Sequence, residues 1–144
     1  MNKLFLLLTL YLIFLNKIDA QENALKVGVS CMDVSPTVFP IQLRSGKSSY
    51  VHDPLHVRAV AFESGEGRAV ICLIDAIGIG REMSDLAKSR AAEKTGWQKE
   101  DMLICATHTH SAPKGGTGMP GREAYEKLKH DKLEEAIVLA IERL

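Results

Sequence analysis

The stretch RAVICLIDAIGIGREMSDLAKSRAAEKTGWQKEDMLICATHTHS, residues 68–111, decides the fold of this chain. It contains two apolar runs, residues 68–75 and 101–106, separated by a segment of helical composition at 81–94 that stops before Gly96. Short apolar runs predict strands, and a glycine directly after a helix is a common stop. The order strand, helix, strand is a βαβ unit, so we expect two parallel strands joined by a right-handed crossover.

The segments upstream of residue 68 predict two more strands. Residues 25–34 and 55–63 are rich in alternating and β-branched apolar side chains, and the two glycines in residues 64–67 predict a hairpin turn. Residues 36–53 predict a long loop near a functional site, because ordered loops of this length are usually functional. The uninterrupted apolar residues 70–74 predict a strand that is covered on both faces.

Residues 123–144 predict the last helix. Its apolar side chains follow the helical series i, i+3, i+4, i+7, i+8, i+11: Leu133, Ala136, Ile137, Ala140, Ile141 and Leu144. Because this helix ends on an apolar residue without a capping signal, we expect another strand to follow and the domain to be incomplete. The predicted fold class is α/β, with a mixed sheet that combines a β-hairpin and a parallel βαβ unit, and with helices packed on the sheet.

The first twenty residues have the pattern of a secretory signal peptide. Asn2-Lys3 is a basic start, Leu4 to Leu15 carries no charge, and Ala20 offers a small residue at the cleavage site. The apolar run is short for a membrane span. We therefore expect a secreted or periplasmic protein, with residues 21–144 as the mature chain and no transmembrane span in it.

Charge and cysteine usage exclude several classes of partner and site. The chain carries 18 basic and 18 acidic residues and no basic tract, so nothing indicates nucleic acid or an anionic membrane surface as a partner. The sequence leaves the oligomeric state open. Cys31, Cys72 and Cys105 each lie in a predicted strand, where we expect buried small hydrophobic side chains. Three thiols cannot all pair internally, and the absence of C-x-x-C spacing argues against a cysteine-based zinc site.

Two histidines, His108 and His110, directly follow the strand at 101–106. In extended backbone such i, i+2 side chains share a face, so both rings are able to converge on one metal ion. Imidazole is the commonest protein ligand for zinc-type metals. Open α/β sheets bind ligands at the carboxyl ends of their strands, where Asp75 is also expected. The alternative is a pair of histidines that only hydrogen-bond the loop.

Two known classes with an H-x-H motif fit poorly. Metallo-β-lactamase-type hydrolases carry H-x-H-x-D-H, whereas this chain has Ala112 and Pro113 at the last two positions. TIM-barrel amidohydrolases place H-x-H on their first strand, and here at least three predicted strands precede it.

A third family matches the motif and its surroundings. The segment from Ala106 to Pro113, Ala-Thr-His-Thr-His-Ser-Ala-Pro followed by Gly115-Gly116, resembles the T-H-T-H-S-[GA]-P-x-G signature of neutral/alkaline, non-lysosomal ceramidases and their bacterial relatives. Supporting matches occur in the same order as in the family: Val27-Gly28-Val29 through Pro36, His52-Asp53-Pro54-Leu55 through Arg58-Ala59, and Val70 to Asp75. The resemblance covers essentially all of residues 21–144.

The resemblance implies a zinc-dependent amidase that cuts the N-acyl bond of ceramide-like lipids to give sphingosine and fatty acid. It implies that His108 is a zinc ligand and that His110 is a catalytic residue, which orients or protonates the scissile amide. The family's other zinc ligands, a second His, a Glu and a Tyr, come from far downstream, so the 144-residue chain alone is expected to be inactive. Two alternatives stay open: a truncated, non-catalytic copy with weak or no metal binding, and another metallohydrolase such as a phosphoesterase.

Several other polar residues are candidates for the same region. Four of them are able in principle to complete a metal site: His52, Asp53, His56 and Asp75. His56 is better explained as a packed or edge histidine, and His130 as a solvated residue on the polar side of the last helix. Asp75 is expected either to orient an imidazole or to be a plain turn residue. Arg44 either faces the site or is a solvated loop residue.

Overall fold

The computed structural model describes residues 24–113 and 120–144. The predicted signal peptide, residues 1–20, and the glycines at 115 and 116 lie outside the described residues. Within the described part, no helix is both long and apolar enough to cross a membrane.

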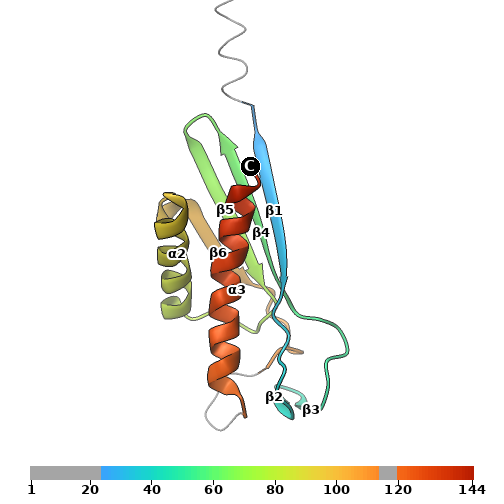
Figure 1. The fold of residues 1–144 in the computed structure, drawn as a ribbon. Coiled ribbons are helices and arrows are strands. Elements are labelled where there is room, and N and C mark those ends of the chain that lie inside the picture. The colour runs from blue at the N-terminus through green and yellow to red at the C-terminus, as the bar shows by residue number, and fades with distance from the viewer. Residues whose placement is uncertain (1–23, 114–119) are drawn as a thin grey trace, which may run out of the picture.

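A four-stranded mixed sheet forms the centre of the fold, with strand order β1-β4-β5-β6 (Figure 1). Its strands are β1 (Lys26–Asp33), β4 (His56–Ser64), β5 (Gly67–Ile74) and β6 (Met102–Ala106). The pairs β1·β4 and β4·β5 are antiparallel, and β5·β6 is parallel with Ile74 opposite Ala106. The four predicted strands, the hairpin and the parallel βαβ pair are thus confirmed.

Two long helices complete the fold. Helix α2 (Arg81–Thr95) connects β5 to β6 through a short 3-10 turn, η1 (Lys99–Asp101). Helix α3 (Arg122–Glu142) is the next element after β6. The predicted glycine stop is confirmed: Gly96 has φ 74°, a conformation open to glycine at no steric cost, and its N–H donates to the Ala92 carbonyl. The two helices lie side by side on one face of the sheet (Figure 1), so the predicted packing of helices on a mixed sheet is confirmed.

The core lies between this sheet face and the helices. Fully buried side chains from β4, β5 and α3 meet there: Val57, Ala59, Ala61, Val70, Cys72, Ile74, Leu133 and Ile137. Helix α3 approaches β1 very closely, because a Cβ on Gly28 would lie 1.9 Å from the Ala140 carbonyl oxygen. The Ser30 hydroxyl, on the same face, donates a 2.6 Å hydrogen bond to the Ala136 carbonyl.

The other face of the sheet corrects two predictions. The apolar run 70–74 is not covered on both faces, because Ile71 remains 46% exposed, and Leu103 opposite it on β6 and Val29 in the same row on β1 are exposed too. Side chains alternate along a strand, and the described helices lie on one side only. Of the three free cysteines, Cys72 is buried as expected, whereas Cys31 points to the open face and is exposed. Burial raises the pKa of the Cys72 thiol to about 12, so it behaves as an inert apolar side chain.

The long loop predicted at 36–53 contains a small two-stranded unit. Strands β2 (Ile41–Leu43) and β3 (Gly46–Ser48) pair in antiparallel fashion, after a cis peptide bond between Phe39 and Pro40. The Gln42 amide group spans the turn and donates to the Gly46 carbonyl. Three-residue strands carry too little periodicity to be distinguished from loop in the sequence.

Candidate functional site

The site lies where β5 and β6 end side by side. The Thr107 N–H donates to the Ile74 carbonyl at 3.0 Å, which continues the parallel ladder one step past β6. The segments 75–77 and 107–111 therefore leave the sheet together, at its carboxyl edge. This is where the sequence places Asp75 and His108, and the expected juxtaposition is confirmed.

His108 adopts an unusual backbone conformation. Its φ is 61°, in the left-handed region that non-glycine residues rarely enter and that concentrates at functional sites. Its ring Nδ1 lies 2.7 Å from the Ile77 carbonyl oxygen. A carbonyl only accepts hydrogen bonds, so Nδ1 carries the proton and Nε2 keeps its lone pair. The ring is thus held in the tautomer that presents Nε2 to a metal ion or a proton.

His110 lies next to this ring. The two ring centroids are 5.2 Å apart with an interplanar angle of 65°, an edge-to-face arrangement. The two rings lie close together, as the i, i+2 spacing predicts, but strand alternation is not what brings them together. Neither histidine belongs to β6, and the left-handed turn at His108 rather than strand alternation sets their relative position.

Asp75 is bound by groups other than His108 and His110. Its Oδ2 accepts the His56 N–H and a hydrogen bond from Arg58 Nη1, both at 2.9 Å, and Arg58 Nη2 lies 3.1 Å from His56 Nδ1. Partial burial raises the pKa of Asp75, but the bonds from His56, Arg58 and the Thr107 side chain outweigh it and bring the pKa below its ordinary value. The carboxylate is therefore ionised at neutral pH.

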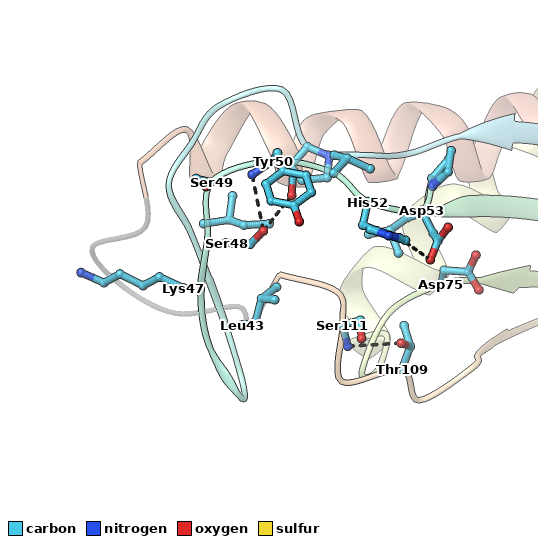
Figure 2. A pocket seen from close by; sticks show the side chains of 15 residues that line it. Leu43, Lys47, Ser48, Ser49, Tyr50, His52, Asp53, Asp75, Thr109 and Ser111 are labelled. Carbon is cyan, nitrogen blue, oxygen red and sulfur yellow. Dashed lines mark hydrogen bonds and ion pairs between the residues drawn. The ribbon is translucent and has the colours of Figure 1, made fainter.

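A hollow of about 750 Å³ borders this edge of the sheet. Figure 2 shows its lining: Tyr50 and His52 come from the segment before β4, Asp75 from the end of β5, and Thr109 and Ser111 from the segment after β6. Most of the remaining lining comes from the loop predicted to lie near a site, residues 36–53, which supports that prediction. A mixed polar and apolar hollow of this volume suits a small-molecule group.

The other candidate residues fall into distinct places. His52 and Asp53 form a 3.0 Å pair that is fully exposed at the hollow. His56 is half-buried at the sheet edge, as expected for an edge histidine. Arg44 is exposed and lines a separate hollow with Ile77 and Gly78, not the one that Tyr50 and Asp75 line.

The prediction that His130 is solvated is wrong, because its side chain is buried. It lies between α2 and α3, with its Nδ1 3.3 Å from Arg90 Nη1. Glu134, one turn later, pairs with Lys94 at 2.6 Å. These contacts take the place of water around His130 and Glu134, where α2 packs against α3.

The described residues do not by themselves supply a full set of metal ligands. In 24–113 and 120–144, no group of three or more His, Cys, Asp or Glu side chains lies close enough together to hold a metal ion. The metal site of His108 is thus not completed by His52, Asp53, His56 or Asp75.

Two groups that hold this region together escaped prediction from the sequence: the Ile77 carbonyl, which accepts from His108, and Arg58, which donates to Asp75. The two-residue period of β4, which places Arg58 and His56 on one face, is the one signal that pointed to Arg58.

Solved ceramidase structures are similar to this fold. Neutral ceramidase from Pseudomonas aeruginosa superposes with a TM-score of 0.73 at 20% identity, covering 84% of this chain and 22% of that chain. A ceramidase complexed with C2 superposes with a TM-score of 0.63 at 19% identity, covering 84% of this chain and 21% of that chain. No family model and no curated protein matches by sequence.

The chain has the fold of part of a neutral ceramidase. It spans about a fifth of the length of the two ceramidase structures. The similarity extends the resemblance seen in the Thr-His-Thr-His-Ser segment to 84% of the chain. At 19–20% identity it concerns the fold alone.

Proposed function

We propose that this chain forms part of a zinc-dependent amidase that resembles neutral ceramidase and hydrolyses the N-acyl amide of ceramide-like lipids to sphingosine and fatty acid. The observation that carries the proposal is the 2.7 Å contact between His108 Nδ1 and the Ile77 carbonyl, because it leaves the Nε2 lone pair available at the carboxyl edge of the sheet, one residue before Thr109, which lines the hollow. Metal-binding histidines typically donate their second ring N–H to a carbonyl or carboxylate in this way.

The donor set fits zinc in part. Catalytic zinc takes three protein ligands and keeps one position open. In the proposal His108 supplies one ligand through Nε2, and the others come from polypeptide outside the described residues. When bound, zinc polarises the amide carbonyl and lowers the pKa of a water molecule.

His110 is proposed as the catalytic residue. Its exposed ring lies edge-on to His108, and an imidazole nitrogen is able to donate or accept a proton. It would orient the scissile amide and donate a proton to the leaving nitrogen. The neighbouring hollow, with Leu43 and Leu55 beside Ser48 and Tyr50, would receive the part of the lipid next to the amide.

Export is part of the same proposal. A signal peptide at residues 1–20 would deliver the enzyme to the periplasm or the outside, with residues 21–144 as the N-terminal portion of the catalytic domain.

The decisive experiment uses the complete open reading frame, read beyond codon 144 if it continues. Purified protein is assayed for fatty-acid release from a fluorescent ceramide and for zinc content. His108→Ala is expected to lose zinc and activity together, whereas His110→Ala should keep zinc and lose about 10²- to 10⁴-fold in kcat. His52→Ala, an exposed histidine at the same hollow, is the matched control and should keep its zinc.

Three outcomes would contradict the proposal. Release of inorganic phosphate from a phosphomonoester, without fatty-acid release, would indicate a phosphoesterase. A frame that stops at codon 144, with no zinc on the purified chain, would indicate a non-catalytic copy. Unchanged zinc content in His108→Ala would remove the assigned ligand.

A further inference from the structure

The segment after β6 divides its side chains between two environments. Thr109 and Ser111 line the large hollow at this edge of the sheet (Figure 2), whereas His108 and His110 do not belong to its lining. The two imidazole rings lie against each other instead, with their centroids 5.2 Å apart. Thr109 therefore stands between the two histidines in the chain and borders the hollow while they contact one another.

A hydrogen bond closes the backbone around His110. The Thr109 Oγ1 atom accepts the Ser111 N–H at 3.2 Å (Figure 2), so these two neighbours enclose the histidine between them. Threonine and serine hydroxyls form such local turns with the N–H two positions further along the chain. Ala112, directly after the turn, is only 1% exposed, so the turn is also anchored on its far side.

The two histidines are held by different means. The His108 ring donates to the Ile77 carbonyl at 2.7 Å, and the Thr107 N–H before it donates to the Ile74 carbonyl at 3.0 Å. Within the described part of the chain, the His110 ring has no hydrogen bond or ion pair, and its ring contact is with His108. The position of the His110 ring consequently depends on the backbone turn that carries it.

We propose that Thr109 is a positioning residue for His110: by accepting the Ser111 N–H, its hydroxyl oxygen fixes the turn that keeps the His110 ring edge-on to His108. The inference rests on the proposed catalytic role of His110. It assigns to Thr109 no contact with a metal ion or with the scissile amide. Because proton transfer requires heavy atoms within hydrogen-bond reach, a small displacement of the His110 ring is costly to catalysis.

NMR spectra of the full chain without metal test the turn itself. Thr109→Val keeps the branched shape but removes the acceptor, so the Ser111 amide should exchange with solvent about 2- to 10-fold faster. The nuclear Overhauser effect between the His108 and His110 rings should weaken, while His108 keeps its proton on Nδ1 because the Ile77 carbonyl still accepts it. Thr109→Ser keeps the oxygen and should match wild type. Ser111→Ala is the matched control, since it removes a hydroxyl at the same hollow and leaves the N–H in place.

Kinetics of the complete protein test the role in catalysis. Thr109→Val should lower kcat about 10- to 100-fold with little change in KM, as for a catalytic group that is present but misplaced. Its zinc content should stay that of wild type, because His108 is held by separate contacts. Thr109→Ser should recover most of the activity. In a His110→Ala background, Thr109→Val should cause no further loss, as for two residues that act as one unit.

The two sets of measurements separate this inference from the proposed function. A wild-type protein that releases no fatty acid would contradict the proposed function, while the expected NMR changes would still support the positioning of His110 by Thr109. An undisturbed contact between the two rings in Thr109→Val would overturn the inference even in an active amidase. Equal losses of activity from Thr109→Val with and without His110 would overturn it as well, and would indicate that the hydroxyl binds substrate directly.

Discussion

The two faces of the sheet are built from the same alternating strands, yet they differ in side-chain size and in cover. The face toward α2 and α3 carries small residues along β1 and β4, including Gly28, Ser30 and Ala59, and these let α3 approach the backbone. The opposite face carries larger apolar residues, and Val29 and Leu103 remain more than half exposed at 56% and 57%.

The apolar character of a strand's side chains therefore does not show which face of the sheet packs against the helices. In the described part of the chain, stability comes from the face that packs against α2 and α3, because the small residues of β1 and β4 let α3 approach and side chains such as Val70 and Ile74 are buried there. The open face contributes little to it. Three predictions break or sharpen this comparison.

The largest effect is expected from Gly28→Ala. A methyl group there would meet the Ala140 carbonyl oxygen at 1.9 Å and the Arg143 carbonyl carbon at 3.1 Å, both backbone atoms that cannot turn aside. We expect a loss of about 3 kcal/mol or more in the free energy of unfolding, measured by urea denaturation followed by circular dichroism. Gly78→Ala, which meets nothing within 4 Å, is the control. A midpoint for Gly28→Ala close to that of wild type would show that α3 does not pack as described.

A matched pair of leucines compares the two faces directly. Leu133 is 0% exposed in the core, so Leu133→Ala should cost about 2 to 5 kcal/mol of unfolding free energy. Leu103 is 57% exposed on the open face, so Leu103→Ala should change it by roughly 0.5 kcal/mol or less. Equal losses in the two variants, measured by the same denaturation, would mean that the open face is buried in solution.

The sheet edge differs from both faces in its response to pH. The folded pKa of Asp75 lies below its ordinary value of 3.8, because hydrogen bonds to its ionised form outweigh the opposing effect of burial. Its stabilising contribution is therefore complete above that value and is lost as pH falls through the lower folded pKa.

Asp75→Asn should consequently be less stable than wild type at pH 7, and the gap should narrow toward pH 2. Thermal unfolding across this range checks the prediction, with Asp53→Asn, an exposed aspartate, as the control for loss of one charge. A gap that widens in acid would mean that Asp75 is not stabilised as a carboxylate in the folded chain.

Much of the fold was predictable because it depends on local patterns. The apolar runs around Val70 and Ile104, the glycine after α2 and the helical series around Leu133 each specify an element without reference to the rest of the chain. The site was predictable in identity, through His108 and His110, but not in geometry. The Ile77 carbonyl and Arg58 carry no motif, and His130 was misplaced because its burial depends on where α2 packs.

By itself the sequence determined the order of the four long strands and the two helices, the parallel βαβ unit and the position of the two histidines at a strand end. Periodicity and turn residues act over a few positions, so they can be followed along the chain. The tertiary structure alone decided which sheet face is covered and the left-handed turn at His108. The covered face depends on contacts such as the bond from Ser30 to Ala136, 106 positions apart, and the His108 ring is held by the Ile77 carbonyl, 31 positions away.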